Sequence, residues 1–332
     1  MDRAPSYIRS KMIGLVCALL VLLSSPQTAS AHDGQPPAPH DLWSAWNWDA
    51  VVILSLILSA WIYAGGQREL RRRVGSQQRS VLSWRAVSFT AGLITLFLAL
   101  VWPLDALSAA LFSAHMLQHM LLIAIIPPLL ILGVSPGSVL LALPSPLQRK
   151  LGSWWRGTRW VKSAFGVLIR PTVAWALNSL TLWVWHAPRL YQAALANEAL
   201  HMLEHLSFIG TSLLFWWTIA RPTARLGRGD SGILALFTMA LQGGFLGALI
   251  TFAPTPWYAA YTSTTRSWGL SWLEDQQLAG AIMWIPVGLI YTVAALILFL
   301  YRLAWIEHQA NQRESLRRKE SKGIASLESR EE

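Results

Sequence analysis

Two histidines, His115 and His119, stand four residues apart within an otherwise apolar stretch, residues 111–132. In an α-helix, residues four apart lie on one face with about 6 Å of rise between them, so both imidazoles point the same way. Imidazole is a common ligand of copper and zinc, and polar groups are costly inside a membrane-spanning segment. We therefore expect the pair to belong to a site, provided that other polar side chains reach the same depth.

A second pair, His201 and His205, repeats this spacing at the start of another apolar stretch, and Glu204 lies between them. His186 ends a third stretch. Glu204 and Asp275 each have two possible roles, as a metal ligand or as an acceptor that orients an imidazole. The candidate metal ligands are His115, His119, His186, His201, Glu204, His205, Asp275 and Met283.

Ligand chemistry favours copper. Imidazoles with thioethers nearby suit copper, magnesium and calcium prefer more oxygen ligands, and zinc stays open. The thioethers also have an ordinary role, since methionine in an apolar helix usually serves packing. The one cysteine, Cys17, lies in a segment that we expect to be removed, which leaves no thiolate for the site.

The elements that carry these residues are apolar helices. Of the 332 residues, 54% are hydrophobic and 13% are charged, and the mean hydropathy is +0.40, as in an all-α polytopic membrane protein. We expect a seven-helix membrane domain over residues 48–302. Its predicted spans are residues 48–64, 86–102, 111–132, 171–186, 201–220, 233–252 and 278–301.

The ends of the chain have other properties. Basic residues, an apolar run too short to span comfortably, and the small-x-small sequence Ala29-Ser30-Ala31 predict a cleavable signal peptide over residues 1–31. Residues 32–47 then form a periplasmic leader. The tail, residues 303–332, mixes charges of both signs, and we expect it to be cytoplasmic and disordered past Gln312.

The distribution of Lys and Arg predicts the orientation. These residues gather in loops 65–85, 149–170 and 221–228 and in the tail, whereas the other loops hold only Arg189 and Arg266. The positive-inside rule places the basic segments in the cytoplasm and the mature N-terminus outside, in agreement with the signal peptide. All five histidines of the predicted spans then lie near the periplasmic face, on three helices.

The chain resembles the CtaG-type assembly factors of caa(3)-type cytochrome c oxidase. The resemblance covers the whole membrane region and rests on His115-Met-Leu-Gln-His119 followed by Pro127-Pro128 and Gly133, on Trp185-His186, on His201-Met-Leu-Glu-His205 with Phe215-Trp216-Trp217, and on Asp275-Gln-Gln-Leu-Ala-Gly280 with Met283-Trp284. It implies a multi-pass protein of the bacterial cell membrane that assists oxidase maturation. It also implies cytochrome c oxidase subunits as partners and copper as the ion supplied.

We therefore expect a non-enzymatic assembly factor that delivers copper from the histidine-rich site. Two alternatives stay open: a membrane cytochrome whose histidines ligate haem, and a copper transporter. The sequence offers no catalytic triad and no phosphate-binding loop. The arginines are accounted for by membrane orientation and lipid contact, so we expect no nucleic-acid partner.

Overall fold

The computed structural model describes residues 36–134, 141–220 and 229–331, and these are helical without any strand. The predicted signal peptide and the first residues of the predicted leader lie outside this part of the chain. The longer elements are α2 (Ala50–Arg73), α3 (Ser76–Leu100), α10 (Pro171–Trp185), α12 (Glu198–Ala220), α13 (Gly229–Thr251) and α14 (Trp272–Glu331). The shorter ones are α4 (Leu104–Ala110), α5 (Phe112–Met120), η2 (Leu121–Ile125), α6 (Ile126–Gly133), α8 (Ser145–Gly157), α9 (Arg159–Leu168), α11 (Pro188–Ala196), η3 (Ala259–Tyr261) and η4 (Thr265–Trp268).

The prediction of an all-helical membrane-type chain is confirmed in its coarse form. Five helical segments of the described chain are long and apolar enough to cross a membrane, and the bent pair α9 and α10, at 69°, makes a sixth if it counts as one span. Helix α12 is 23 residues long but is not among them, since His201, Glu204 and His205 lower its hydropathy. Seven spans therefore stays a prediction, as does the orientation.

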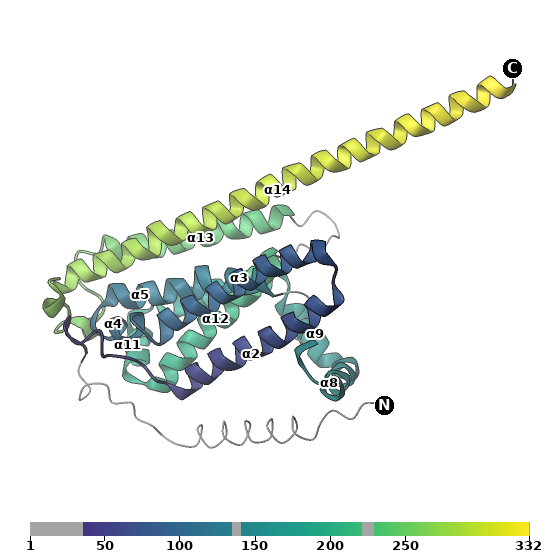
Figure 1. Ribbon diagram of the computed structural model, residues 1–332. Helices are drawn as coiled ribbons and strands as arrows, with labels where there is room; N and C mark the ends of the chain where they lie inside the picture. Colours follow the sequence, from purple (N-terminus) through teal and green to yellow (C-terminus); the bar gives the residue numbers. More distant parts are fainter. Residues whose placement is uncertain (1–35, 135–140, 221–228, 332) are drawn as a thin grey trace.

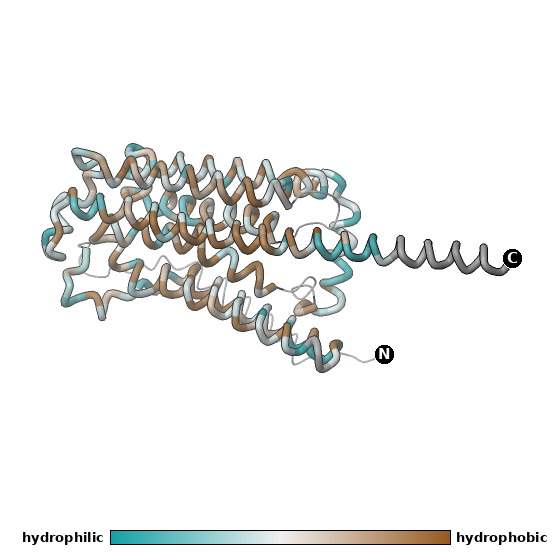
Figure 2. The backbone as a smooth tube through the Cα atoms, turned by 90° about the horizontal axis from the view of Figure 1, so that it is seen from above, coloured by the Kyte–Doolittle hydropathy of each residue, from teal (hydrophilic) through white to brown (hydrophobic). Residues whose placement is uncertain are grey.

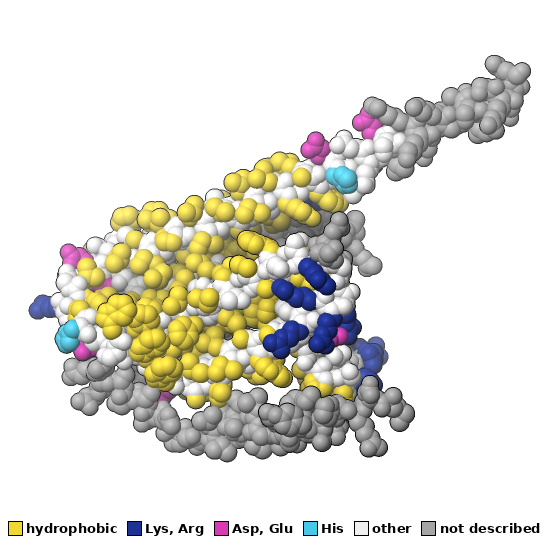
Figure 3. Space-filling model, in the orientation of Figure 1, with side chains coloured by type: hydrophobic (Ala, Val, Ile, Leu, Met, Phe, Trp, Pro, Cys, Tyr) yellow, Lys and Arg dark blue, Asp and Glu magenta, His cyan; other side chains and the backbone are white. Residues whose placement is uncertain are grey.

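The helices run lengthwise beside one another, with α4 and α11 at one end and α8 and α9 at the other (Figure 1). Hydrophobic residues occupy the length of the bundle and hydrophilic ones its ends (Figure 2). Lys and Arg side chains gather at the end formed by α8 and the last turn of α2, which holds Arg71, Arg72 and Arg73 (Figure 3). The bundle thus presents an apolar belt with one strongly basic end.

The third predicted span is broken into α5, η2 and α6, and its prolines explain why. Pro127 has no N–H to donate to the carbonyl of Ile123 one turn earlier, so the α-helical pattern cannot continue unchanged. The chain passes through one π-helical turn, and Trp216 Nε1 of α12 donates to the Ile123 carbonyl at 3.1 Å. The carbonyl that the break leaves without its helical partner is therefore satisfied by α12, the helix that also carries His201 and His205.

The tail differs from expectation. We expected disorder past Gln312, but α14 continues as a helix to Glu331 and projects far beyond the bundle (Figure 1). Glu, Arg and Lys dominate this segment, and these residues have high helix propensity. Charge and polarity favour solvation of the tail, but they do not by themselves disfavour a helix.

Helices α13 and α14 approach closely at a pair of glycines. A Cβ added at Gly280 would lie 2.6 Å from the carbonyl oxygen of Gly247 and 2.6 Å from the backbone nitrogen of Thr251. Small residues permit this kind of approach between helices in membranes. Because α14 also carries Asp275, the glycine pair helps to set the position of the site.

We expect Gly280→Ala to force α13 and α14 apart and to lower the free energy of unfolding by about 1–3 kcal/mol. Gly288→Ala on the same helix is the matched control, since its added Cβ meets nothing within 4 Å. Thermal unfolding in detergent measures both. Equal midpoints for the two variants would contradict the close approach.

Candidate metal centre

Helix α5, which carries His115 and His119, is held at its start by a residue from α14. The carboxylate of Asp275 accepts hydrogen bonds from the backbone N–H of Phe112 at 2.7 Å and of Ser113 at 3.2 Å, and from Ser113 Oγ at 2.5 Å. Asp275 is fully buried. The N-cap residue of α5 makes no side-chain capping hydrogen bond, so Asp275 caps this helix instead. A carboxylate at this place satisfies the free N–H groups and complements the helix dipole.

His115 and His119 point at each other, as their spacing predicts. Their Nε2 atoms lie 2.9 Å apart, and both side chains are almost completely buried. Two nitrogens bound to one tetrahedral ion at about 2.0 Å would be about 3.3 Å apart, so the pair is close to the separation that shared ligation requires.

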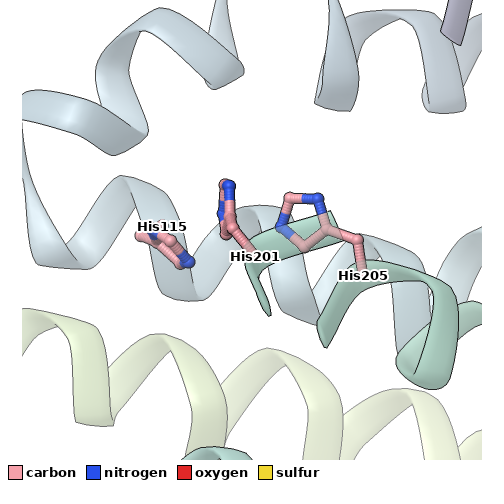
Figure 4. Close-up of side chains that lie close together, drawn as sticks. All are labelled: His115, His201 and His205. Carbon is pink, nitrogen blue, oxygen red and sulfur yellow. The ribbon is translucent and has the colours of Figure 1, made fainter. Parts of the chain in front are cut away.

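Helix α12 brings the second pair to the first. Asn197 caps the helix by accepting a hydrogen bond from the Leu200 N–H at 3.0 Å, which places His201 one turn inside. One ligand atom from each of His115, His201 and His205 lies within 4.8 Å of the others (Figure 4). The same holds for a second group, His115, His119 and Glu204. Four histidines and a glutamate from two helices thus form one cluster.

His186 borders the cluster at the end of α10, which stops before Pro188. Its Nδ1 donates to the Leu182 carbonyl at 2.7 Å, an arrangement that leaves Nε2 with a free lone pair. The His186 ring centroid lies 6.1 Å from that of His119. Phe208 packs against both rings, at 4.7 Å from His119 and 5.9 Å from His186, and closes this side with an apolar surface.

Three tyrosines contact His115, the backbone of His186 and one another. Tyr261 Oη lies 3.2 Å from His115 Nδ1, 2.8 Å from Tyr191 Oη and 3.2 Å from the Ser108 carbonyl, while Tyr258 donates to the His186 carbonyl at 2.8 Å. Burial raises the pKa of the Tyr261 phenol, so it stays protonated. The assignment that satisfies these partners has Tyr261 donating to Ser108 and accepting from His115 Nδ1–H. His115 Nε2 then carries the lone pair, which in this arrangement accepts a hydrogen bond from His119 Nε2–H at 2.9 Å.

Several buried polar atoms in and beside the cluster lack hydrogen bonds. Within the described chain, His186 Nε2, His201 Nε2, His205 Nε2 and both oxygens of Glu204 have no hydrogen-bond partner. Glu204 Oε1 lies 3.7 Å from His119 Nε2, within range of an ion pair but beyond a hydrogen bond. Buried polar groups are almost always satisfied, so atoms of this kind facing one another fit a bound cation. The donor set of imidazoles and one carboxylate suits copper or zinc.

Two predicted ligands lie apart from this donor set. The oxygens of Asp275 are taken up by the start of α5, which gives Asp275 a positioning role. Met283 is 1% exposed and belongs to the hydrophobic core, as does Met116, whereas Met202 is 41% exposed. The Met239 thioether accepts hydrogen bonds from Ser179 and Gln242 instead. The thioether argument for copper therefore has no support in the geometry.

Sequence reasoning missed the aromatic shell. Tyr191 lies in a short helix, and Tyr258 and Tyr261 in a loop whose polar and aromatic content is visible in the sequence. That loop follows the sixth predicted span on the same side as the histidines, a signal that could have placed it near the site. No spacing rule links these tyrosines to particular histidines.

Comparison with known proteins gives a family match. A model of the cytochrome c oxidase caa3 assembly factor family matches residues 61–304. Uncharacterized proteins of Mycobacterium bovis and Mycobacterium tuberculosis are each 28% identical over 276 residues, which cover 79% of this chain and 40% of theirs. One from Mycobacterium leprae is 24% identical over 288 residues, 84% of this chain and 42% of its own. The chain thus spans less than half the length of these relatives. No solved structure matches it.

We expect Asp275→Ala to destabilise the protein by about 2 kcal/mol, because it leaves the start of α5 uncapped. Asp275→Asn retains one carbonyl acceptor and should cost less. Thermal unfolding gives both values, and metal analysis of the folded Asp275→Asn protein should match the wild type. Loss of metal from Asp275→Asn with unchanged stability would instead make Asp275 a ligand.

Proposed function

The chain belongs to the cytochrome c oxidase caa3 assembly factor family, and we propose that it serves oxidase assembly by holding a copper ion in the histidine and glutamate cluster. Copper is the cargo in this proposal, handed on to an oxidase subunit. The protein acts by binding and release, without catalysis. Membership of the family supports the general role in oxidase assembly, and the residues of the cluster support copper binding.

The observation that carries the proposal is the convergence of unpartnered ligand atoms in a buried place. His115, His119, His201, His205 and Glu204 form two groups of three that share His115, and within each group one ligand atom per residue lies within 4.8 Å of the others. A hydrogen-bonded histidine network would satisfy these atoms with one another. His115 Nε2 and His119 Nε2 do pair at 2.9 Å, but within the described chain Nε2 of His201, Nε2 of His205 and both oxygens of Glu204 have no hydrogen-bond partner. A cation satisfies the lone pairs of the imidazoles and the charge of the carboxylate together.

The location of the cluster suits an ion that arrives from outside the cell. Helices α4 and α11, which lie near the cluster, are at the end of the bundle opposite α8 and α9 (Figure 1). The basic side chains gather at the α8 end (Figure 3). With the basic end in the cytoplasm, the cluster lies toward the periplasmic side of the bacterial cell membrane.

Neither alternative gains support from the geometry. Haem requires a flat slot between its two ligands. The imidazole rings instead contact one another, with centroids 4.3 Å apart for His115 and His119 and 5.4 Å apart for His115 and His201. A transport path would need free polar groups farther along the bundle, but Asn178 accepts a hydrogen bond from Ser212, and Gln242 donates one to Ser179.

Copper content tests the site directly. Protein purified after copper-replete growth should hold copper, and His115→Ala/His119→Ala should reduce the affinity more than tenfold, because two adjoining ligands are lost. The matched control is His40→Ala/His308→Ala, which removes two histidines outside the cluster. Wild-type protein without copper, or a double variant that retains it fully, would refute the site.

Oxidase maturation tests the role. Cells that lack the protein should make a caa(3)-type oxidase with low activity and low copper content, because the cargo is not delivered. The wild-type gene should restore both quantities, and the His115→Ala/His119→Ala gene should not. Fully copper-loaded oxidase in the deletion strain would contradict the proposed role.

A further inference from the structure

The ligand atoms form two overlapping groups instead of one. The first group, His115, His201 and His205, is called the outer station, and the second, His115, His119 and Glu204, is called the inner station. In each group the ligand atoms lie within 4.8 Å of one another, and only His115 belongs to both. An ion in one station is therefore already bound to a ligand of the other.

The two stations differ in access. His201 and His205 are partly exposed at the start of α12, although their Nε2 atoms are buried. His119 and Glu204 are each 0% exposed, and Phe208 packs against His119. The outer station therefore lies nearer to the surface than the inner station, which is enclosed.

The two stations also differ in charge. The outer station offers neutral imidazoles, while the inner station adds the carboxylate of Glu204. Glu204 has no hydrogen-bond donor in the described chain, and His119 Nε2 lies 3.7 Å from its Oε1, so a cation bound between them interacts favourably with the carboxylate. The ion is thereby drawn from the outer to the inner station.

His115 limits the pair of stations to one ion at a time. Its Nδ1 lies against Tyr261 Oη at 3.2 Å, which leaves Nε2 as the nitrogen that can bind a metal. A single lone pair binds a single ion, so the stations are alternatives for one ion and do not form a two-metal centre.

We propose that these two stations form a relay in which one copper ion moves from the outer to the inner station while it stays bound to His115 Nε2. The bonds from copper to His201 and His205 break, and the bonds to His119 Nε2 and a Glu204 oxygen form. The proton of His119 moves to its unpartnered Nδ1, and the oxidation state of copper is unchanged. This relay rests on the proposed function, since it assumes that copper is the cargo.

Loading and release kinetics with Cu(I) and a chromophoric chelator test the relay on the full-length protein in detergent. The wild type should bind one ion per chain. His201→Ala/His205→Ala should still bind one ion but load at least about tenfold more slowly, because the outer station is gone. His119→Ala/Glu204→Gln should load at the wild-type rate and lose copper to the chelator at least about tenfold faster. His308→Ala, outside the cluster, should change neither rate.

Each contrary result has a distinct meaning. Two ions per wild-type chain, or equal loss of binding in both double variants, would overturn the relay and leave copper binding intact. A wild-type protein that takes up no Cu(I) would overturn the proposed function together with the relay. If His119→Ala/Glu204→Gln does not fold, the isosteric Glu204→Gln alone should show the faster release, and an unchanged release rate there would also overturn the relay.

Discussion

The main constraint on this structure is the free-energy cost of burying the Glu204 carboxylate among imidazoles without a hydrogen-bond donor. Both carboxylate oxygens are unpaired in the described chain, and the side chain is fully buried. An isolated carboxylate in such a place costs at least several kcal/mol unless a cation or a proton offsets its charge. A bound metal ion resolves this cost and satisfies the neighbouring imidazole lone pairs at the same time. This cost supports the proposal that the cluster is a cation site.

The surroundings place the ligands before any ion arrives. Asp275 holds the start of α5, Trp216 satisfies the backbone where the prolines break that span, and Tyr261 sets which nitrogen of His115 is free. Each contact joins segments far apart in the sequence. Preorganisation of this kind lowers the entropy lost on binding and favours a definite geometry. The same contacts link the fold of the bundle to the chemistry of the cluster.

Much of this arrangement could be predicted from the sequence. The four-residue spacing predicted that His115 lies beside His119 and His201 beside His205, because helical geometry is local. The apolar runs predicted where the long helices lie in the sequence. The role of Asp275 could not be predicted in this way. The same two carboxylate oxygens can either cap the start of a helix or bind a metal ion. Tyr191 and Tyr261 were missed since their approach to His115 depends on loop and tertiary geometry. Pro127 and Pro128 predict a break in this span by a local rule, but the form of the break, a π-helical turn satisfied by Trp216, depends on a neighbouring helix.

X-ray absorption spectroscopy of the copper-loaded protein identifies the atoms that bind copper. Copper held by the histidines and Glu204 should show a first shell of nitrogen and oxygen neighbours at about 2.0 Å with the multiple scattering of imidazole, and no sulfur. A shell of sulfur neighbours at about 2.3 Å would assign copper to methionines and contradict the histidine and glutamate site.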